Sequence, residues 1–147
     1  MTDLTPYVFL DTNILVYAHG VDDHDSRSKL ARRLMDDLWE SRMGMLCTQV
    51  LQEFYRVATR KLLMPRAEAR GIVASYMDWC AVSTDLALIV SASKLEEDHT
   101  LGFWDALVIS SALRGGATRL LSEDLQHGRK FGFLTIENPF LGRCTSI

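Results

Sequence analysis

The sequence predicts an α/β fold in which a central parallel sheet of about four or five strands carries helices on both faces. Short, fully apolar runs such as residues 7–10 are typical of strands that are buried on both sides. These runs alternate with longer segments whose apolar residues recur at helical spacing, as in parallel sheets with helical crossovers. With 147 residues, 48% of them hydrophobic, we expect residues 1–147 to form one domain.

The first strand is expected at residues 7–10, and the small polar residues 11–13 lead from it into a helix. A second helix is indicated over 26–41, because its apolar residues lie on one face and its charged residues on the other. Either Asp25 or Ser26 can cap this helix at its start. The chain therefore begins with one strand followed by two helices.

The middle of the chain repeats this order of strand and helices. Residues 45–47 are expected to form a short strand, and Thr48 can cap the helix that follows. Pro65 opens a fourth helix at its first turn, where the missing amide hydrogen costs nothing. Residues 81–83 are a further strand candidate.

The last third is expected to hold two helices and two strands. The helices are indicated at about 85–97 and 102–113, and the glycine pair 115–116 ends the second one. Strands are indicated at 119–121 and 133–136. Both of these strands run directly into polar and acidic residues, as the first strand does.

Targeting and redox signals predict a cytoplasmic protein that does not associate with membranes. The start of the chain has no basic segment and no apolar run long enough for a signal peptide. The longest later apolar run is far shorter than a membrane-spanning helix. Three widely spaced cysteines without a CxxC pair favour reduced thiols, and the four histidines show no metal-binding spacing.

The net charge of −3 argues against a protein that coats nucleic acid by charge alone, so any contact with nucleic acid must be local. The basic residues nevertheless cluster in two segments, which we interpret as solvated helix faces. The clusters are Arg27, Lys29, Arg32 and Arg33, and Arg56, Arg60, Lys61, Arg66 and Arg70.

Two acidic candidates follow apolar strands, at the edge where parallel sheets bind ligands. Asp11 follows the first strand and can also cap the next helix. Asp124 and its neighbour Glu123 follow the strand at 119–121. Successive residues leaving a strand point to opposite sides, so only one of this pair can face a site, and we choose Asp124; a plain turn is the alternative.

Two further candidates lie on expected helices. Asp105 lies in a first helical turn among apolar neighbours, where a carboxylate needs a hydrogen bond, an ion pair, a metal or a raised pKa. Its alternative role is favourable placement at a helix N-terminus. Glu53 has the weakest pattern, since a glutamate on an amphipathic helix is usually solvated. It follows the second strand closely enough to lean over the same edge of the sheet.

If these carboxylates converge, their repulsion must be offset by protonation or by a cation. All-oxygen sites favour Mg²⁺ or Mn²⁺, and Mg²⁺ binds through a few carboxylates, water and substrate phosphate oxygens. Such an ion lowers the pKa of a bound water so that hydroxide can attack phosphorus. The chemistry expected of the convergent acids is therefore phosphodiester hydrolysis.

Five segments, four of which contain these acids, resemble the PIN-domain family, and within it the toxin ribonucleases called VapC. They occur in the family's order over nearly the whole chain, and they are residues 9–13, 52–54, 103–107, 121–125 and 136–140.

The resemblance implies a PIN-like fold and a metal cluster that binds Mg²⁺, with Mn²⁺ able to substitute. The implied cluster consists of Asp11, Glu53, Asp105 and Asp124. Asn13 and Ser122 are implied as polar supports near it. The resemblance also implies cleavage of RNA as an endoribonuclease, a homodimer, and inhibition by a small antitoxin protein.

Two other interpretations compete with a metal-dependent ribonuclease. A haloacid-dehalogenase-like phosphatase also starts with an apolar strand ending in Asp, but it needs a second Asp two residues later, where this chain has Asn13. A PIN-like module that binds RNA or a protein without cutting is the non-enzymatic alternative. The presence of all four acids counts against that module.

Overall fold

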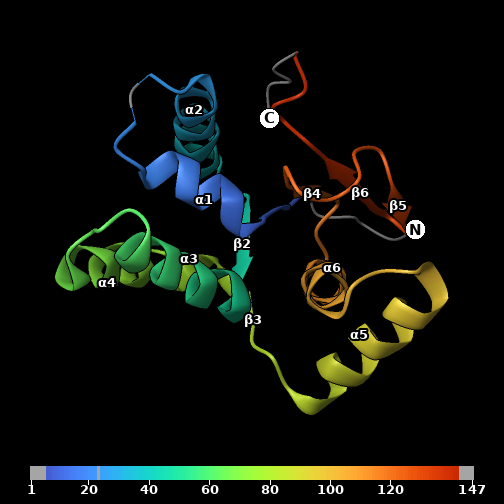
Figure 1. Cartoon of the computed structure of the whole chain (residues 1–147). Helices are drawn as coiled ribbons and strands as arrows, with labels where there is room; N and C mark the ends of the chain where they lie inside the picture. Colours follow the sequence, from blue (N-terminus) through green and yellow to red (C-terminus); the bar gives the residue numbers. More distant parts are fainter. Residues whose placement is uncertain (1–5, 23, 143–147) are drawn as a thin grey trace.

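The computed structural model describes residues 6–22 and 24–142, which form an α/β fold around one sheet (Figure 1). Within these residues the sheet has six strands in the order β3-β2-β1-β4-β6-β5. Their bounds are β1 Val8–Leu10, β2 Gly44–Cys47, β3 Cys80–Val82, β4 Arg119–Leu121, β5 Lys130–Phe131 and β6 Leu134–Glu137. All neighbouring strands pair in parallel except β5 and β6. The predicted fold class is confirmed.

The helices fill the connections between the strands. They are α1 Thr12–His19, α2 Ser26–Ser41, α3 Thr48–Arg60, α4 Arg66–Ser75, α5 Leu86–His99 and α6 Phe103–Gly115, and a short 3₁₀ helix, η1, spans Met77–Trp79. Helix α1 packs against α2 and α3, whereas α6 packs against α5, β2 and β3 (Figure 1). Among the described helices, none has both the length and the apolar character that crossing a membrane requires.

The order of the strands creates a switch point between β1 and β4. The chain moves from β1 outward to β2 and β3, then returns through α6 to β4 on the other side of β1. Leu10 pairs with Leu121, so the two strands end level with each other. Because connections leave such a point in opposite directions, the carboxyl ends of β1 and β4 border the crevice where α/β sheets bind ligands.

The core of the molecule is formed by the sheet and the inner faces of the helices. Apart from the partly exposed Arg119 at the start of β4, the residues of β1 and β4 are apolar and buried, so neither strand shows the alternation of a half-exposed strand. Buried core side chains from different elements include Phe9, Ile14, Leu38, Leu46, Phe54, Leu88, Ile109 and Leu120.

Local details differ from the expectations in several places, and most elements begin or end one or two residues away from the expected positions. Thr48 is the first residue of α3, and Cys47 occupies the cap position without a side-chain hydrogen bond, so the expected Thr48 cap is wrong. The last strand, β6, begins and ends one residue later than expected. Strand β5 was not predicted, because two residues before the turn at Gly132 carry no periodicity, and Gly132 itself has a φ of 58°.

Gly44 provides a test of how tightly β2 packs against η1. A Cβ at Gly44 would overlap the indole ring of Trp79, which is buried and lies 4.5 Å from the ring of Trp39. We expect Gly44→Ala to lower the free energy of unfolding by about 1–3 kcal/mol in urea denaturation, because the indole cannot move freely. The matched control is Gly71→Ala on α4, where an added Cβ meets nothing within 4 Å.

The control should instead gain about 0.5–1 kcal/mol, since alanine is preferred over glycine inside a helix. Equal stability of Gly44→Ala and the parent protein would contradict the packing described for β2.

Candidate active site

Strand β1 delivers Asp11 to the carboxyl edge of the sheet. Its backbone N–H donates to the carbonyl oxygen of Leu121 at 3.0 Å, which extends the pairing of β1 with β4 by one residue. Asp11 also caps α1, since its Oδ1 accepts a hydrogen bond from the N–H of Thr12 at 2.8 Å. The hydroxyl of Ser122 donates to the other oxygen, Oδ2, at 2.8 Å. Asp11 therefore acts as a helix cap and still lies at the edge of the sheet.

The turn after β4 is held by Ser122 and Asn13. The Ser122 hydroxyl oxygen accepts hydrogen bonds from the N–H groups of Asp124 at 3.1 Å and Leu125 at 3.3 Å. The side-chain amide of Asn13 donates to Asp124 Oδ2 at 3.2 Å, and its oxygen accepts from the N–H of Glu123 at 3.1 Å. Both expected polar supports thus bind the turn that carries Asp124.

The side chains of Glu123 and Asp124, which follow β4, contact different partners. The Glu123 carboxylate accepts hydrogen bonds from the Tyr17 hydroxyl at 2.5 Å and from Arg27 at 2.9 Å. Arg27 also pairs with Asp25 at 3.1 Å and lies 4.8 Å from the centre of the Tyr17 ring. Glu123 is therefore neutralised on the side of α1 and α2, whereas Asp124 contacts Asn13.

Glu53 is brought to the same edge by α3 and is oriented by two residues that the sequence analysis missed. The Thr12 hydroxyl donates to Glu53 Oε2 at 3.0 Å, and the side-chain amide of Gln49 donates to Oε1 at 2.8 Å. Gln49 precedes Glu53 by four residues, a helical spacing that could have indicated this pair. The same Gln49 amide lies 3.4 Å from the carbonyl oxygen of Trp104. It thereby links α3 to the start of α6.

Asp105 lies in the first turn of α6, as expected, but its side chain is exposed. Its carboxylate accepts no hydrogen bond from any residue that the structure describes. Partial desolvation raises its pKa, and the charges of Asp124 and Glu53 raise it further. Asp105 therefore combines a position in the first turn of α6 with a raised pKa.

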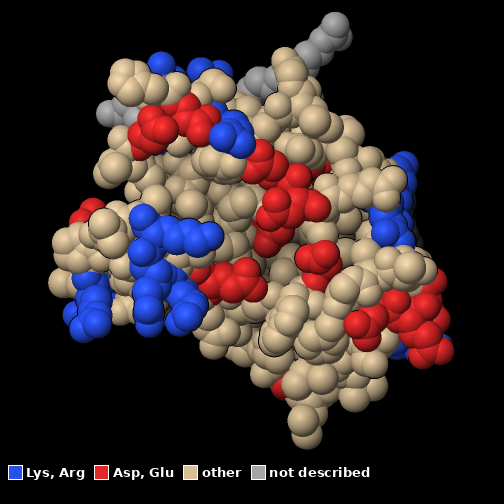
Figure 2. Space-filling view, in the orientation of Figure 1, with Lys and Arg blue, Asp and Glu red and all other residues tan. Residues whose placement is uncertain are grey.

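The four acids repel one another electrostatically. Burial raises the pKa of Asp11 to about 6, the charges of Glu53 and Asp124 contribute to this rise, and the hydrogen bonds from Ser122 and Thr12 oppose it. None of the four carboxylates forms an ion pair with a described basic residue. Figure 2 shows acidic side chains gathered at the centre of this face. The edge therefore carries a negative charge that the described residues leave uncompensated.

The donor set suits a hard divalent cation, because carboxylate oxygens are the ligands that Mg²⁺ and Mn²⁺ prefer. Over residues 6–22 and 24–142, however, no three acidic, histidine or cysteine side chains lie close enough together to hold one ion. Mg²⁺ does not need such a cage, since it commonly binds through one or two carboxylates and keeps several waters. The chemistry of the residues fits an ion of this kind.

The fold and this edge define an α/β protein with an acidic crevice at the switch point of its sheet. The model of the PIN domain family matches residues 8–130, and the chain belongs to that family. The resemblance drawn from the sequence is thereby confirmed. No curated protein is significantly similar to the chain in sequence.

Seven chains of solved structures are similar to this chain. One of them is VapC20 of Mycobacterium tuberculosis, described as a toxin that cleaves the sarcin-ricin loop. It is 20% identical, with a TM-score of 0.59, over 80% of this chain and 91% of that chain. At this level of identity the likeness shows a shared fold.

Burial of Asp11 predicts a pH dependence of stability in protein kept free of divalent ions. A pKa raised from 3.8 to about 6 means that the folded state favours protonated Asp11. Its contribution to stability is complete below about pH 4 and is lost as the pH rises through about 6. We expect the free energy of unfolding of the parent, relative to Asp11→Asn, to fall by about 3 kcal/mol between pH 4 and 7 in EDTA.

Urea denaturation at several pH values measures this difference. Asp36→Asn is the matched control, because Asp36 is an exposed acid on α2. A pH profile of Asp11→Asn that is parallel to that of the parent would contradict the burial of Asp11.

The hydroxyl of Ser122 should lower the pKa of Asp11. We expect Ser122→Ala to move the Asp11 titration, followed by carboxyl carbon NMR, to a pH above that of the parent. The same change leaves two backbone N–H groups without their acceptor and should cost about 1–3 kcal/mol of stability. Ser111→Ala is the control, since this buried hydroxyl of α6 bonds only the carbonyl of Leu107 among the described residues.

If the Asp11 titration moves equally in both serine variants, or in neither, the hydrogen bond from Ser122 does not set the charge state of Asp11.

Proposed function

We propose that this protein is a magnesium-dependent endoribonuclease whose active site is the acidic crevice. The observation that carries the proposal is the gathering of carboxylates from β1, β4, α3 and α6 at one switch point, with no basic residue paired to them in the described chain. A polyanionic substrate would be repelled there unless a cation were present. Membership of the PIN-domain family supports this function.

Asp11, Glu53, Asp105 and Asp124 are the residues proposed to hold Mg²⁺, with Mn²⁺ able to replace it. The bound ion supplies charge compensation for a phosphate and a water of lowered pKa as the nucleophile. The remaining residues act by holding the acids in place. The Ser122 hydroxyl and the Thr12 N–H stabilise the ionised form of Asp11, and the Thr12 hydroxyl orients Glu53. Asn13 holds Asp124 at the start of α1.

Asp11 also imposes a condition on the reaction. Its pKa of about 6 means that the free crevice is partly protonated in mildly acidic solution. Deprotonation of Asp11 is needed before its oxygens can bind a cation. We therefore expect cleavage of RNA to be faster at neutral pH than below pH 5.

We further propose that the chain is the toxin of a toxin-antitoxin pair in the cytoplasm. The shared fold with VapC20, a toxin that cleaves the sarcin-ricin loop, supports this role. The proposed state is a homodimer of chains in which residues 1–147 form one PIN domain, inhibited by a small antitoxin protein. Expression with and without the protein encoded next to it tests this role, since only expression alone should stop growth.

Of the alternatives, the phosphatase is discarded because the chain belongs to the PIN-domain family. Asn13 also binds Asp124 and the N–H of Glu123, so it serves as a structural link rather than as a proton donor. The other alternative, a PIN domain that binds RNA without cutting it, is tested by the cleavage experiment that follows.

The test measures cleavage of a labelled RNA by the parent and by Asp11→Asn and Asp105→Asn, with Mg²⁺ or with EDTA. We expect cleavage by the parent with Mg²⁺ only, and a loss of at least about 100-fold in each variant, because each removes a charge that binds the cation. Asp36→Asn, which changes an exposed acid of α2, should cut like the parent.

Two results would contradict the proposal. If both Asp11→Asn and Asp105→Asn cut RNA at the parental rate, the acidic crevice is not the active site. Absence of cleavage by the parent, with RNA binding retained, would favour the non-catalytic module.

A further inference from the structure

Gln49 carries an unpaired polar atom in the interior of the protein. Its side chain is only 6% exposed. Among the residues that the structure describes, its oxygen Oε1 is the one buried side-chain oxygen or nitrogen without a hydrogen-bond partner. Folded proteins pair nearly all such atoms, because an unpaired acceptor that is shielded from water destabilises the folded state. The amide at this position therefore has a cost that its other contacts must explain.

The orientation of the Gln49 amide is fixed by two acceptors. Its Nε2 donates to Glu53 Oε1 at 2.8 Å, and the carbonyl oxygen of Trp104 is a second, more distant acceptor at 3.4 Å. If the amide were turned over, its oxygen would face a carboxylate and a carbonyl, neither of which has a hydrogen to donate. Both N–H bonds of the amide are thus used, and Oε1 is the atom left over.

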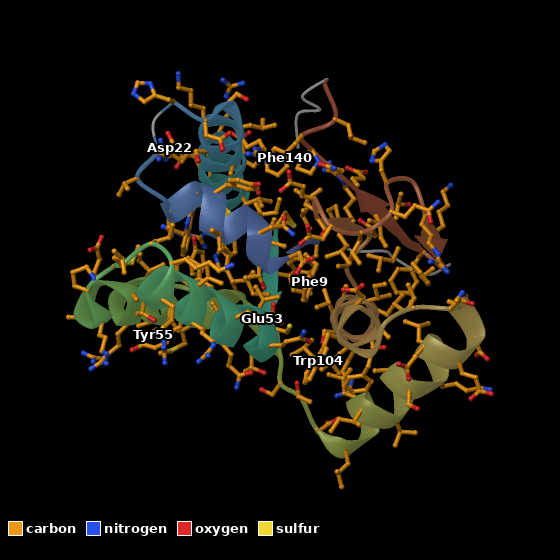
Figure 3. All side chains as sticks on the ribbon, in the orientation of Figure 1. Phe9, Asp22, Glu53, Tyr55, Trp104 and Phe140 are labelled. Atoms are coloured by element: carbon orange, nitrogen blue, oxygen red, sulfur yellow. The ribbon has the colours of Figure 1, made fainter. Side chains whose placement is uncertain are left out.

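These two hydrogen bonds join the helices that carry two of the acids. Glu53 lies on α3, one turn after Gln49, and Trp104 directly precedes Asp105 in the first turn of α6. Figure 3 shows Glu53 and Trp104 close to each other where α3 meets the start of α6. The Gln49 amide therefore holds the Glu53 carboxylate in place relative to the turn that carries Asp105.

Glu53 has one donor on each of its carboxylate oxygens. The Thr12 hydroxyl donates to Oε2, and the Gln49 amide donates to Oε1. The Glu53 side chain is nevertheless exposed, so water would replace a lost donor and little stability would be lost with it. What the two donors provide is a single orientation of the carboxylate, in which each oxygen keeps a lone pair for another partner.

We propose that Gln49 is a positioning residue of the cation site, and that it favours Mg²⁺ over Ca²⁺ by holding Glu53 in one orientation. Mg²⁺ demands near-ideal octahedral geometry, whereas Ca²⁺ takes more oxygen ligands in a flexible arrangement. A carboxylate held at both oxygens suits Mg²⁺, and a carboxylate free to rotate and to bind through both oxygens suits Ca²⁺. This inference rests on the proposed cation-binding function of the crevice and adds a residue that acts on the ion through Glu53.

The experiment measures cation binding without RNA. Electron paramagnetic resonance counts free Mn²⁺, and Mg²⁺ and Ca²⁺ are each titrated against bound Mn²⁺. We expect Gln49→Met, which keeps the length of the side chain without its amide, to bind Mn²⁺ and Mg²⁺ about tenfold more weakly. Binding of Ca²⁺ should change much less, so the ratio of Mg²⁺ to Ca²⁺ affinity falls. Gln49→Asn, which keeps the amide but is too short to reach both acceptors, should show the same fall.

Stability separates a positioning role from a role in the core. Gln49→Met removes the unpaired oxygen and leaves Glu53 to water, so we expect its midpoint in urea denaturation to be at least that of the parent. A residue needed for packing would lower this midpoint when replaced. Gln52→Met is the matched control, because Gln52 is an exposed glutamine of the same helix. It should leave both the midpoint and the ratio of affinities unchanged.

A double-mutant cycle tests whether Gln49 acts through Glu53. In protein that carries Glu53→Gln, the further change Gln49→Met should weaken Mn²⁺ binding no more, because the carboxylate that it positions is gone. The inference is overturned if Gln49→Met weakens binding equally in both backgrounds, if it lowers the urea midpoint, or if both Gln49 variants keep the parental ratio of Mg²⁺ to Ca²⁺ affinity.

Asp11→Asn separates this inference from the function on which it rests. If Asp11→Asn weakens Mn²⁺ binding and the Gln49 variants do not, the cation site stands and the positioning role is overturned. If Asp11→Asn binds Mn²⁺ like the parent, the crevice does not hold the ion, and the inference falls together with the proposed function. If the Gln49 variants behave as expected but the parent does not cut RNA, the positioning role stands and the ribonuclease proposal fails.

Discussion

The parallel pairing of β1 with β4 is the constraint on which the rest of the site depends. Leu10 and Leu121 end level with each other, and the hydrogen bond from the Asp11 N–H to Leu121 continues the ladder past both strands. This places Asp11 against Ser122, within reach of the hydroxyl. Every other contact of the crevice is built outward from this pair: Asn13 ties α1 to the turn after β4, and Thr12 ties α1 to α3.

The crevice is electrostatically unfavourable by itself, and the fold tolerates this cost because hydrogen bonds offset part of it. Ser122 and Thr12 donate to Asp11, which burial would otherwise keep protonated to a higher pH. Glu123 shows the contrast, since the same turn gives it Tyr17 and Arg27 as partners. The charge of Glu123 is therefore compensated by Arg27, whereas those of Asp11 and Asp124 are not compensated by any described basic residue. The missing positive charge is what a bound divalent cation would supply.

The surface around the crevice is organised along α3 and α6. Helix α3 carries Glu53 and then Arg56 and Arg60 on one face, while α6 presents Trp104 and Asp105 from its first turn. An amphipathic helix explains the buried side of α3 but not the order of charges on its exposed side.

Apolar strands that end in acids, with helices between them, were enough to predict the α/β class and the first-turn position of Asp105, because these depend on local periodicity and capping. They also predicted most elements to within one or two residues of their bounds. The sequence also singled out the four acids. It could not predict the antiparallel β5, the exposure of Trp104 and Asp105, or the donors Thr12 and Gln49 that orient Glu53. Exposure and long-range hydrogen bonds depend on which helices lie side by side at the edge of the sheet. The order of the strands in the folded sheet, in which β4 returns beside β1, determines which helices these are.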